Sequence, residues 1–163
     1  MTEINPYIFE LNLKETKISS WTDFNTGNLI PKLSKPLTGS DYKIYVITSD
    51  KKVLYVGTTK SSLKSRLNSG LKASGKNGYH GYKWKNEKNI RIFVWNFTEL
   101  DKYQTENIEA ELAFNVRTKT GKWPKFQNEI HFNNSYEEKG KIIAEKMYEQ
   151  IINCGEKTQG NTV

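Results

Sequence analysis

Residues 90–97 (IRIFVWNF) constrain the fold of this chain more than any other segment. Apolar residues occupy both of the faces that alternate along it, whereas a strand with one solvated face alternates apolar with polar residues. We therefore expect this segment to form a strand in the middle of a sheet. The rest of the chain must supply neighbours for that strand.

Two β-rich runs that precede this segment predict such neighbours. Residues 43–48 (KIYVIT) and 53–57 (VLYVG) are rich in β-branched and aromatic side chains, and residues 49–52 (SDKK) separate them. Runs of this composition joined by a four-residue turn predict a β-hairpin. The predicted sheet therefore has at least three strands.

Three segments have the spacing of apolar residues that is typical of helices. In the first, leucines recur at every fourth position from Leu63 until Gly75 ends the pattern. The third begins at Asn134 or Ser135, and Ser135 and Glu138 have the spacing of a capping box. The predicted helices span residues 63–74, 101–118 and 135–155.

A chain of 163 residues has room for one domain with additions at its ends. Residues 7–13 alternate weakly, as an edge strand does, and residues 25–40 contain the prolines and glycines of a connecting arm. The predicted division is an N-terminal arm (1–40), a core (41–130), a C-terminal helix (131–155) and a disordered tail (156–163).

Positive charge is concentrated in the middle of the sequence. Residues 51–91 contain eleven basic side chains and one acidic side chain, a net charge of +10, which leaves −3 for the rest of a chain whose total is +7. A concentrated positive field favours a polyanion, of which nucleic acid is the commonest. A solvated lysine-rich face is the alternative interpretation of the same charges.

Other features narrow the class of protein. The sequence does not open on a signal-peptide pattern, and no run approaches the ~20 apolar residues of a membrane span, so we expect a cytoplasmic protein without a membrane partner. Cys154 is the single cysteine, which excludes an intrachain disulfide and a cysteine-rich zinc site.

Four side chains form the candidate site. The hairpin puts Tyr45 and Tyr55 on adjacent strands, and Arg66 follows on the next helix, at the border of its buried stripe. Glu109 lies on the apolar side of the second helix. Burying an unpaired carboxylate costs several kcal/mol, so we expect a cation beside it. That cation is a metal ion or a side chain, and an ion pair with Arg66 would only support the fold.

The order of these elements resembles that of the GIY-YIG endonuclease family. The family has two short strand motifs, an arginine on the next helix, a metal-binding glutamate on a later helix and a terminal asparagine. The resemblance covers residues 42–128 and is carried by KIY (43–45), YVG (55–57), Arg66, Glu109 within IEAEL, and a closing P-x-x-x-N formed by Pro124 and Asn128.

The resemblance implies an α/β fold of the α+β kind, in which helices flank a small central sheet of three mostly antiparallel strands. The implied activity is the hydrolysis of phosphodiester bonds in DNA with one Mg²⁺ (or Mn²⁺) ion as cofactor. Glu109 would hold that ion, whose other ligands are waters and substrate oxygens. One carboxylate is too few for a permanent two-metal site.

The resemblance also implies roles for the other three residues. Tyr45 would be the general base for the attacking water, which requires nearby cations such as Arg66 to lower the pKa of a phenol from about 10. Arg66 would also grip the non-bridging phosphate oxygens. Tyr55 would hydrogen-bond the phosphate or the water, with cross-strand packing as its alternative role.

Three positions depart from the family pattern. Lys43 replaces the first glycine of GIY and removes a position of close backbone approach. Gly70 stands where some members carry a histidine one helical turn after the arginine. The role of that histidine is therefore taken by His80 or is absent. An error of register would exchange Glu109 for Glu111 as the metal ligand, although IEAEL aligns best with Glu109.

Further residues are candidates for contact with DNA. The stretch 79–85 (YHGYKWK) interleaves rings with cations beside glycines, which suits backbone contact and base stacking. The alternative is that Tyr82 and Trp84 pack in the core while the lysines face water. His80 is a catalytic candidate whose alternative is exposure to solvent. The predicted substrate-binding residues are Gly57, Lys60, Lys64, Lys83 and Asn128.

Several functions fit these features. An endonuclease comes first, and a compact restriction enzyme is favoured over a mobile-element or repair nuclease. A nucleic-acid-binding module that has lost turnover belongs to a different class, and the joint presence of Tyr45, Tyr55, Arg66 and Glu109 speaks against it. RNA as the substrate also fits the sequence.

Overall fold

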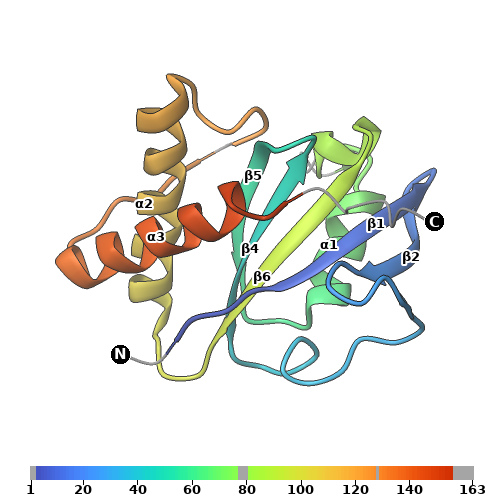
Figure 1. Cartoon of the computed structure of the whole chain (residues 1–163), viewed down its shortest axis with the longest axis horizontal. Helices are drawn as coiled ribbons and strands as arrows, with labels where there is room; N and C mark the ends of the chain where they lie inside the picture. The colour runs from blue at the N-terminus through green and yellow to red at the C-terminus, as the bar shows by residue number, and fades with distance from the viewer. Residues whose placement is uncertain (1–2, 77–80, 128, 156–163) are drawn as a thin grey trace, which may run out of the picture.

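The computed structural model describes residues 3–76, 81–127 and 129–155. In this part of the chain the predicted α+β fold is confirmed, but six strands rather than three form the antiparallel sheet, in the order β3-β2-β1-β6-β4-β5 (Figure 1). The strands are β1 (Tyr7–Lys14), β2 (Lys17–Asp23), β3 (Leu29–Ile30), β4 (Tyr42–Ser49), β5 (Lys52–Thr59) and β6 (Ile90–Phe97).

Strand β6 lies inside the sheet, as its sequence predicts. β4 pairs with one side of it and β1 with the other. Residues 92–95 are all buried, so consecutive side chains of this strand pack on opposite faces of the sheet. The apolar character of both faces of this segment is thereby explained.

The N-terminal residues enlarge the sheet. The prediction of an edge strand over residues 7–13 is wrong, because β1 lies between β6 and β2. Phe9 and Leu11 of β1 are buried, whereas Glu10 between them remains partly exposed. That one-sided burial gives the weak alternation of an edge strand, although both edges of β1 are paired.

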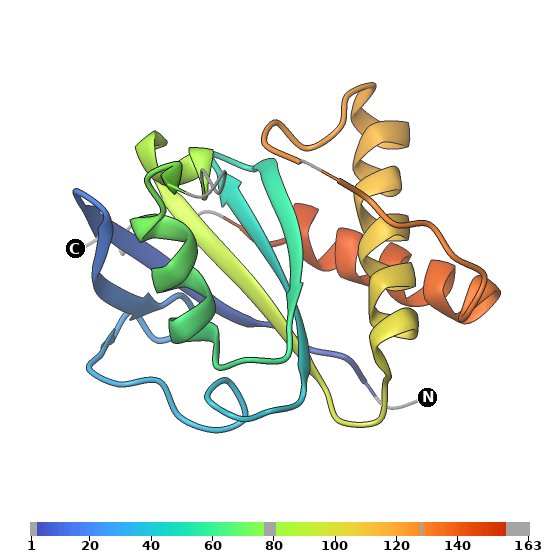
Figure 2. The ribbon, with the colours of Figure 1, turned by 180° about the vertical axis from the view of Figure 1, so that it is seen from behind.

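Helices cover both faces of the sheet. α1 (Leu63–Lys72) lies on one face, and α2 (Lys102–Thr120) and α3 (Glu137–Ile152) lie on the other, where they cross each other (Figures 1 and 2). A short 3-10 helix, η2 (Lys83–Asn86), precedes β6. None of the helices in the described segments is long and apolar enough to span a membrane.

The start of α3 differs from the prediction. Tyr136 precedes the helix and provides no side-chain cap, so the predicted capping box of Ser135 and Glu138 is not formed. The backbone amide of Ser135 instead donates to Oδ1 of Asn133, at 2.9 Å. Ser135 therefore belongs to the turn before the helix, where its amide is hydrogen-bonded to Asn133, and α3 begins two residues later than expected.

The sheet separates two hydrophobic cores. Tyr45 and Val94 belong to the core under α1, whereas their neighbours Ile44 and Val46 belong to the core under α2 and α3. Alternation along β4 therefore directs Tyr45 toward α1. The candidate site lies on that side of the sheet.

Candidate active site

The two tyrosines of the hairpin lie on the same face of the sheet. Tyr45 of β4 is paired with Gly57 of β5, and Ile47 of β4 is paired with Tyr55 of β5. The ring centroids of Tyr45 and Tyr55 are 6.0 Å apart. The structure therefore brings the two predicted phenols side by side.

Gly57 makes this arrangement possible. A Cβ atom at position 57 would lie 2.7 Å from Cζ and the hydroxyl oxygen of Tyr45, and 2.7 Å from Cε1 of Tyr55. Carbon atoms do not pack at such distances, so any side chain here would displace both rings. The glycine of the YVG motif thus leaves room for the two tyrosines.

Helix α1 places Arg66 beside these rings. The helix begins after Ser62, whose side chain accepts a hydrogen bond of 3.2 Å from the amide of Ser65. The guanidinium carbon of the half-buried Arg66 lies 5.9 Å from the ring centroid of Tyr82. Burial lowers the pKa of Arg66, but Tyr45 and Tyr82 raise it by more, so the guanidinium stays charged. Among the described residues, its Nε is buried without a hydrogen-bond partner.

Tyr45 is completely buried, and its hydroxyl oxygen lies 2.7 Å from that of Tyr82. Burial raises the pKa of Tyr45 well above its usual value, Tyr82 and Tyr55 raise it further, and Arg66 opposes them. A general base at Tyr45 requires Arg66 to lower this pKa. Its effect has the required sign, but burial outweighs it, so the phenol of the free protein is protonated at neutral pH.

Helix α2, which covers the other face of the sheet, places Glu109 against the edge strand β5, where it is hydrogen-bonded to Thr58 and lies within electrostatic range of Arg66. The side chain is partly buried. Burial, with a further contribution from Glu106, raises the pKa of Glu109 to about 8, although a hydrogen bond with Thr58 and the charge of Arg66 partly oppose this rise. The fold-supporting ion pair between Glu109 and Arg66 is not among the salt bridges of the described residues. Glu109 therefore lies within electrostatic range of Arg66 without an ion pair to it among the described residues, and in the free protein its carboxyl group is mostly protonated at neutral pH.

The surroundings of Glu109 fit one divalent ion. The carboxylate of Glu109 and the hydroxyl of Thr58 are oxygen donors of the kind that Mg²⁺ prefers, and Mg²⁺ keeps several waters. A carboxyl group whose pKa is raised by burial is stabilised in its ionised form when a cation arrives. No cluster of three or more His, Cys, Asp or Glu side chains capable of holding a metal occurs in the described segments. The donor set therefore suits a single ion shared with substrate and water.

Glu111 does not share this position. Two residues along an α-helix correspond to a rotation of about 200°, so Glu111 points away from the side of α2 that faces Thr58. The register that assigns Glu109 to the site is the one supported by its electrostatic contacts with Thr58 and Arg66.

Tyr82 is a further member of the site that was not predicted from the sequence. Its ring occupies the space beside Gly70 of α1, where an added Cβ atom would lie 2.0 Å from Cε2 of Tyr82. Gly81, with φ +67°, lets the chain approach so closely that the amide of Tyr82 donates to the carbonyl of Gly70 at 3.0 Å. The place where some family members carry a histidine therefore holds a phenol from another segment. In the sequence, Gly70 and Gly81 are the residues that could have indicated this close approach of two segments.

Lys43 replaces the first glycine of the motif and is fully buried. Its Nζ donates to the carbonyl oxygens of Gly39 at 2.8 Å, Asp41 at 2.7 Å and Ser61 at 3.4 Å. Burial lowers the pKa of Lys43, while Asp41 raises it. Lys43 thus joins the segment before β4 to the loop before α1, a role that the sequence alone did not indicate.

The closing motif packs against the free edge of β5. The side chain of Gln127 accepts a hydrogen bond from the amide of Val56 at 2.9 Å and donates to its carbonyl at 3.0 Å. The amide of Phe126 donates to the carbonyl of Leu54 at 2.8 Å. Gln127 therefore fixes this segment to the sheet. Asn128, which was predicted to bind the substrate, lies outside the described residues.

The other predicted contact residues are on the surface or are not described. Lys60, Lys64 and Lys83 are exposed, and Nζ of Lys60 lies 5.3 Å from the ring centroid of Tyr42. Trp84 is fully buried, as the alternative interpretation held. His80 lies outside the described residues.

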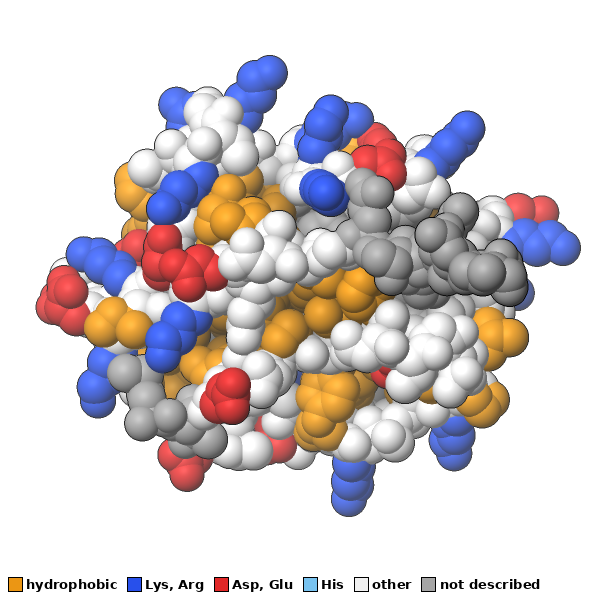
Figure 3. All heavy atoms as spheres, in the orientation of Figure 1, with side chains coloured by type: hydrophobic (Ala, Val, Ile, Leu, Met, Phe, Trp, Pro, Cys, Tyr) orange, Lys and Arg blue, Asp and Glu red, His pale blue; other side chains and the backbone are white. Residues whose placement is uncertain are grey.

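The described residues on the face that carries α2 and α3 form no continuous basic surface (Figure 3). Figure 3 shows Lys and Arg side chains spread around its margin among acidic ones, with apolar side chains nearer the centre. A surface of this kind does not attract a polyanion as a concentrated positive field does.

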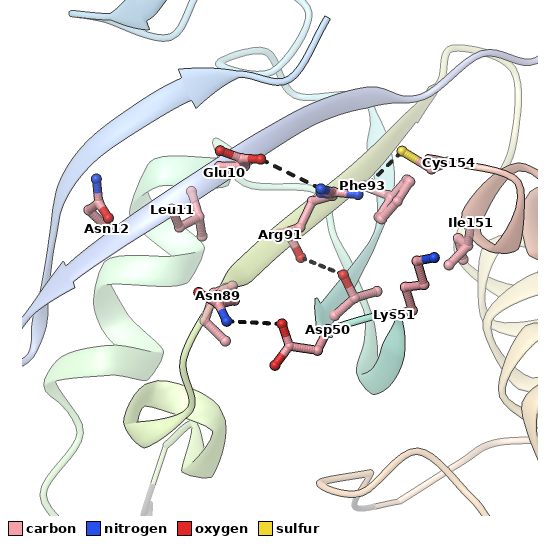
Figure 4. Close-up of a pocket in the computed structure, with 12 residues that line it drawn as sticks. Glu10, Leu11, Asn12, Asp50, Lys51, Asn89, Arg91, Phe93, Ile151 and Cys154 are labelled. Atoms are coloured by element: carbon pink, nitrogen blue, oxygen red, sulfur yellow. Dashed lines mark hydrogen bonds and ion pairs between the residues drawn. The ribbon is translucent and has the colours of Figure 1, made fainter. Parts of the chain in front are cut away.

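A cavity of about 390 Å³ lies away from these residues, between β1, β6 and the end of α3 (Figure 4). Its main cation, Arg91, contacts Glu10 at 3.5 Å and stacks over Phe24 at 4.1 Å. Asn89 donates to Asp50 at 2.9 Å. These polar groups are engaged with one another, and none of the residues that line the cavity belongs to the candidate site.

One comparison with known proteins bears on the chain. The family model described as the GIY-YIG catalytic domain matches residues 41–122, which are 82 of the 163 residues. The match includes the two tyrosines, Arg66 and Glu109, and ends before Gln127. No curated protein and no solved structure gave a significant match.

Proposed function

The chain belongs to the GIY-YIG family, whose catalytic domain implies a nuclease, and we propose that it is a metal-dependent endonuclease that hydrolyses phosphodiester bonds in DNA. One observation carries this proposal. Tyr45, Tyr55, Arg66 and Glu109 come from four different elements, and the fold gathers them around the end of the hairpin that contains Gly57.

Hydrolysis of a phosphodiester requires an activated water, compensation of the phosphate charge and stabilisation of the leaving oxygen. Arg66 is a planar donor suited to the non-bridging oxygens, and its buried Nε has no hydrogen-bond partner among the described residues. Glu109, beside Thr58, would hold one Mg²⁺ or Mn²⁺ ion. Such an ion, when bound, offsets negative charge on the phosphate and on the leaving oxygen.

We assign Tyr45 as the group that accepts the proton of the attacking water, and Tyr55 as a hydrogen-bond partner of the water or the phosphate. Burial and Tyr82 favour the protonated phenol of Tyr45, whereas Arg66 favours the ionised one. The proposed base therefore depends on positive charge in the site, and Arg66 supplies it in the protein itself.

We further propose DNA as the substrate and a compact restriction enzyme as the biological type. The basic residues between positions 51 and 91 include exposed Lys60, Lys64 and Lys83, which lie in the same part of the chain as Arg66. Cations around a reactive arginine would hold the phosphates on either side of the scissile one.

The proposal is tested with supercoiled plasmid DNA, in Mg²⁺ and in chelator. The wild-type protein should nick or linearise the plasmid only with the metal, and Glu109→Gln should abolish cutting while leaving DNA affinity nearly intact. Binding without nicking would identify a non-catalytic module. An unchanged cleavage rate for Glu109→Gln would show that Glu109 is not the metal ligand. Preferential cutting of an RNA hairpin over its DNA equivalent would show that the substrate is RNA and not DNA.

A further inference from the structure

Tyr82 is held in the site by an unusually close fit between two segments. Its ring lies against Gly70, where no side chain could be accommodated, and its amide is bonded to the carbonyl of the same residue. On its other side the ring stacks on Trp84, with centroids 5.1 Å apart and planes 30° apart. The Tyr55 ring contacts it at 5.5 Å in an edge arrangement. These contacts fix the ring.

The hydroxyl of this fixed ring points at the proposed base. It lies 2.7 Å from the hydroxyl of Tyr45, and both side chains are buried. The guanidinium of Arg66 lies over the ring of Tyr82 at 5.9 Å, so the three groups form one cluster. Packing alone would be served by phenylalanine, since a buried hydroxyl is costly unless it is hydrogen-bonded.

A phenol can rotate its O–H bond and rock its ring, so the fixed backbone of β4 does not by itself orient the reacting oxygen of Tyr45. We propose that Tyr82 is a positioning residue of the reaction, whose hydroxyl holds that of Tyr45 in the orientation needed to meet the attacking water. This inference rests on the proposed nuclease function. The close contact between Gly70 and Gly81 allows the segment that carries Tyr82 to approach α1, and so brings the Tyr82 hydroxyl to Tyr45 from outside the hairpin.

The test is Tyr82→Phe, which keeps the ring, its stacking on Trp84 and its fit against Gly70. We expect kcat for plasmid cleavage to fall roughly tenfold, with KM for DNA unchanged, because the orientation of the reacting group is lost. The pKa of Tyr45 should also fall without Tyr82, which favours the ionised base and so cannot account for a lower rate. Tyr148→Phe is the matched control, since Tyr148 is a buried tyrosine of α3 in the other core. It should cut at the wild-type rate.

A double-mutant cycle separates positioning from general damage to the fold. If Tyr82 acts through Tyr45, adding Tyr82→Phe to Tyr45→Phe should cause no further loss of the residual rate. In protein labelled at tyrosine Cζ, the NMR signal that is missing from Tyr45→Phe should also move in Tyr82→Phe, without DNA present. This readout reports the hydrogen bond itself, independently of cleavage.

Three results would overturn the inference. A normal kcat for Tyr82→Phe, an additive loss in the cycle, or an unmoved Tyr45 signal would each show that the hydroxyl of Tyr82 does not position the base. Failure of the proposed function gives a different result, because the wild-type protein would then cut no nucleic acid while the Tyr45 signal still responded to Tyr82→Phe. In that case the hydrogen bond between Tyr82 and Tyr45 is present, but it has no role in nucleic-acid cleavage.

Discussion

Replacing Glu109 by glutamine should make the metal-free protein more stable at alkaline pH. Burial, with a contribution from Glu106, raises the pKa of Glu109 from 4.5 to about 8 in the folded protein. Between these values the folded carboxyl keeps its proton while the unfolded one has lost it, so the folded state binds more protons and its stability falls as pH rises. Above about pH 8 the loss is complete.

The size of the effect follows from the pKa values. The difference between 4.5 and about 8 corresponds to an upper limit of roughly 5 kcal/mol for ionising this group in the fold. The side chain of Glu109 keeps partial contact with solvent, which screens the charge. We therefore expect Glu109→Gln to raise the free energy of unfolding by about 1–3 kcal/mol at pH 9. At pH 5 the two proteins should be almost equally stable.

The measurement is urea denaturation at pH 5 and pH 9, with chelator present, followed by the fluorescence of the four tryptophans. Glu111→Gln, a partly exposed position on the same helix, controls for the removal of one negative charge. Glu109→Gln could instead give the same stability change at both pH values, or destabilise the protein at pH 9. Either result would show that ionisation of Glu109 does not lower the stability of the folded protein. Its assignment as a metal ligand would then lose its physical basis.

Three further substitutions test the site and its support. Tyr45→Phe should still fold, with a loss of stability no larger than the roughly 1–3 kcal/mol of the unpaired Tyr82 hydroxyl, and lose at least roughly 100-fold in kcat as a missing general base; normal cutting would place the base elsewhere. Lys43→Met should lower the free energy of unfolding in urea by about 1–3 kcal/mol, because buried carbonyls lose their donor; equal stability would mean that water replaces Nζ. Gly57→Ala should lower stability by about 1–3 kcal/mol and abolish cutting, since its Cβ would displace the tyrosine rings, and a crystal structure with unmoved rings would contradict this.

Local patterns in the sequence predict the elements that carry the site. Residues 90–97 have apolar side chains on both faces, and β6 is indeed an inner strand. The leucines from Leu63 onward predict α1, whose observed end at Lys72 lies before Gly75 as expected. These features depend on spacing within one segment, which a sequence shows directly.

The features that the sequence did not reveal depend on two segments meeting. β1 is an inner strand because β6 offers it an edge, which no pattern within residues 7–13 can show. The position of Tyr82 depends on the absence of a side chain at Gly70, twelve residues earlier. The raised pKa of Tyr45 follows from complete burial on α1's side of the sheet, whereas the sequence shows only that a cation follows on the next helix.

The docking of Gln127 on Val56 has a consequence for association between molecules. An outer strand with free amide and carbonyl groups can recruit a strand from another chain and start aggregation. At Val56 both groups are already bonded to the carboxamide of Gln127, and the carbonyl of Leu54 is taken by Phe126. The opposite border of the sheet is β3, only two residues long. The enlarged sheet thus offers little template for intermolecular β-pairing at either border.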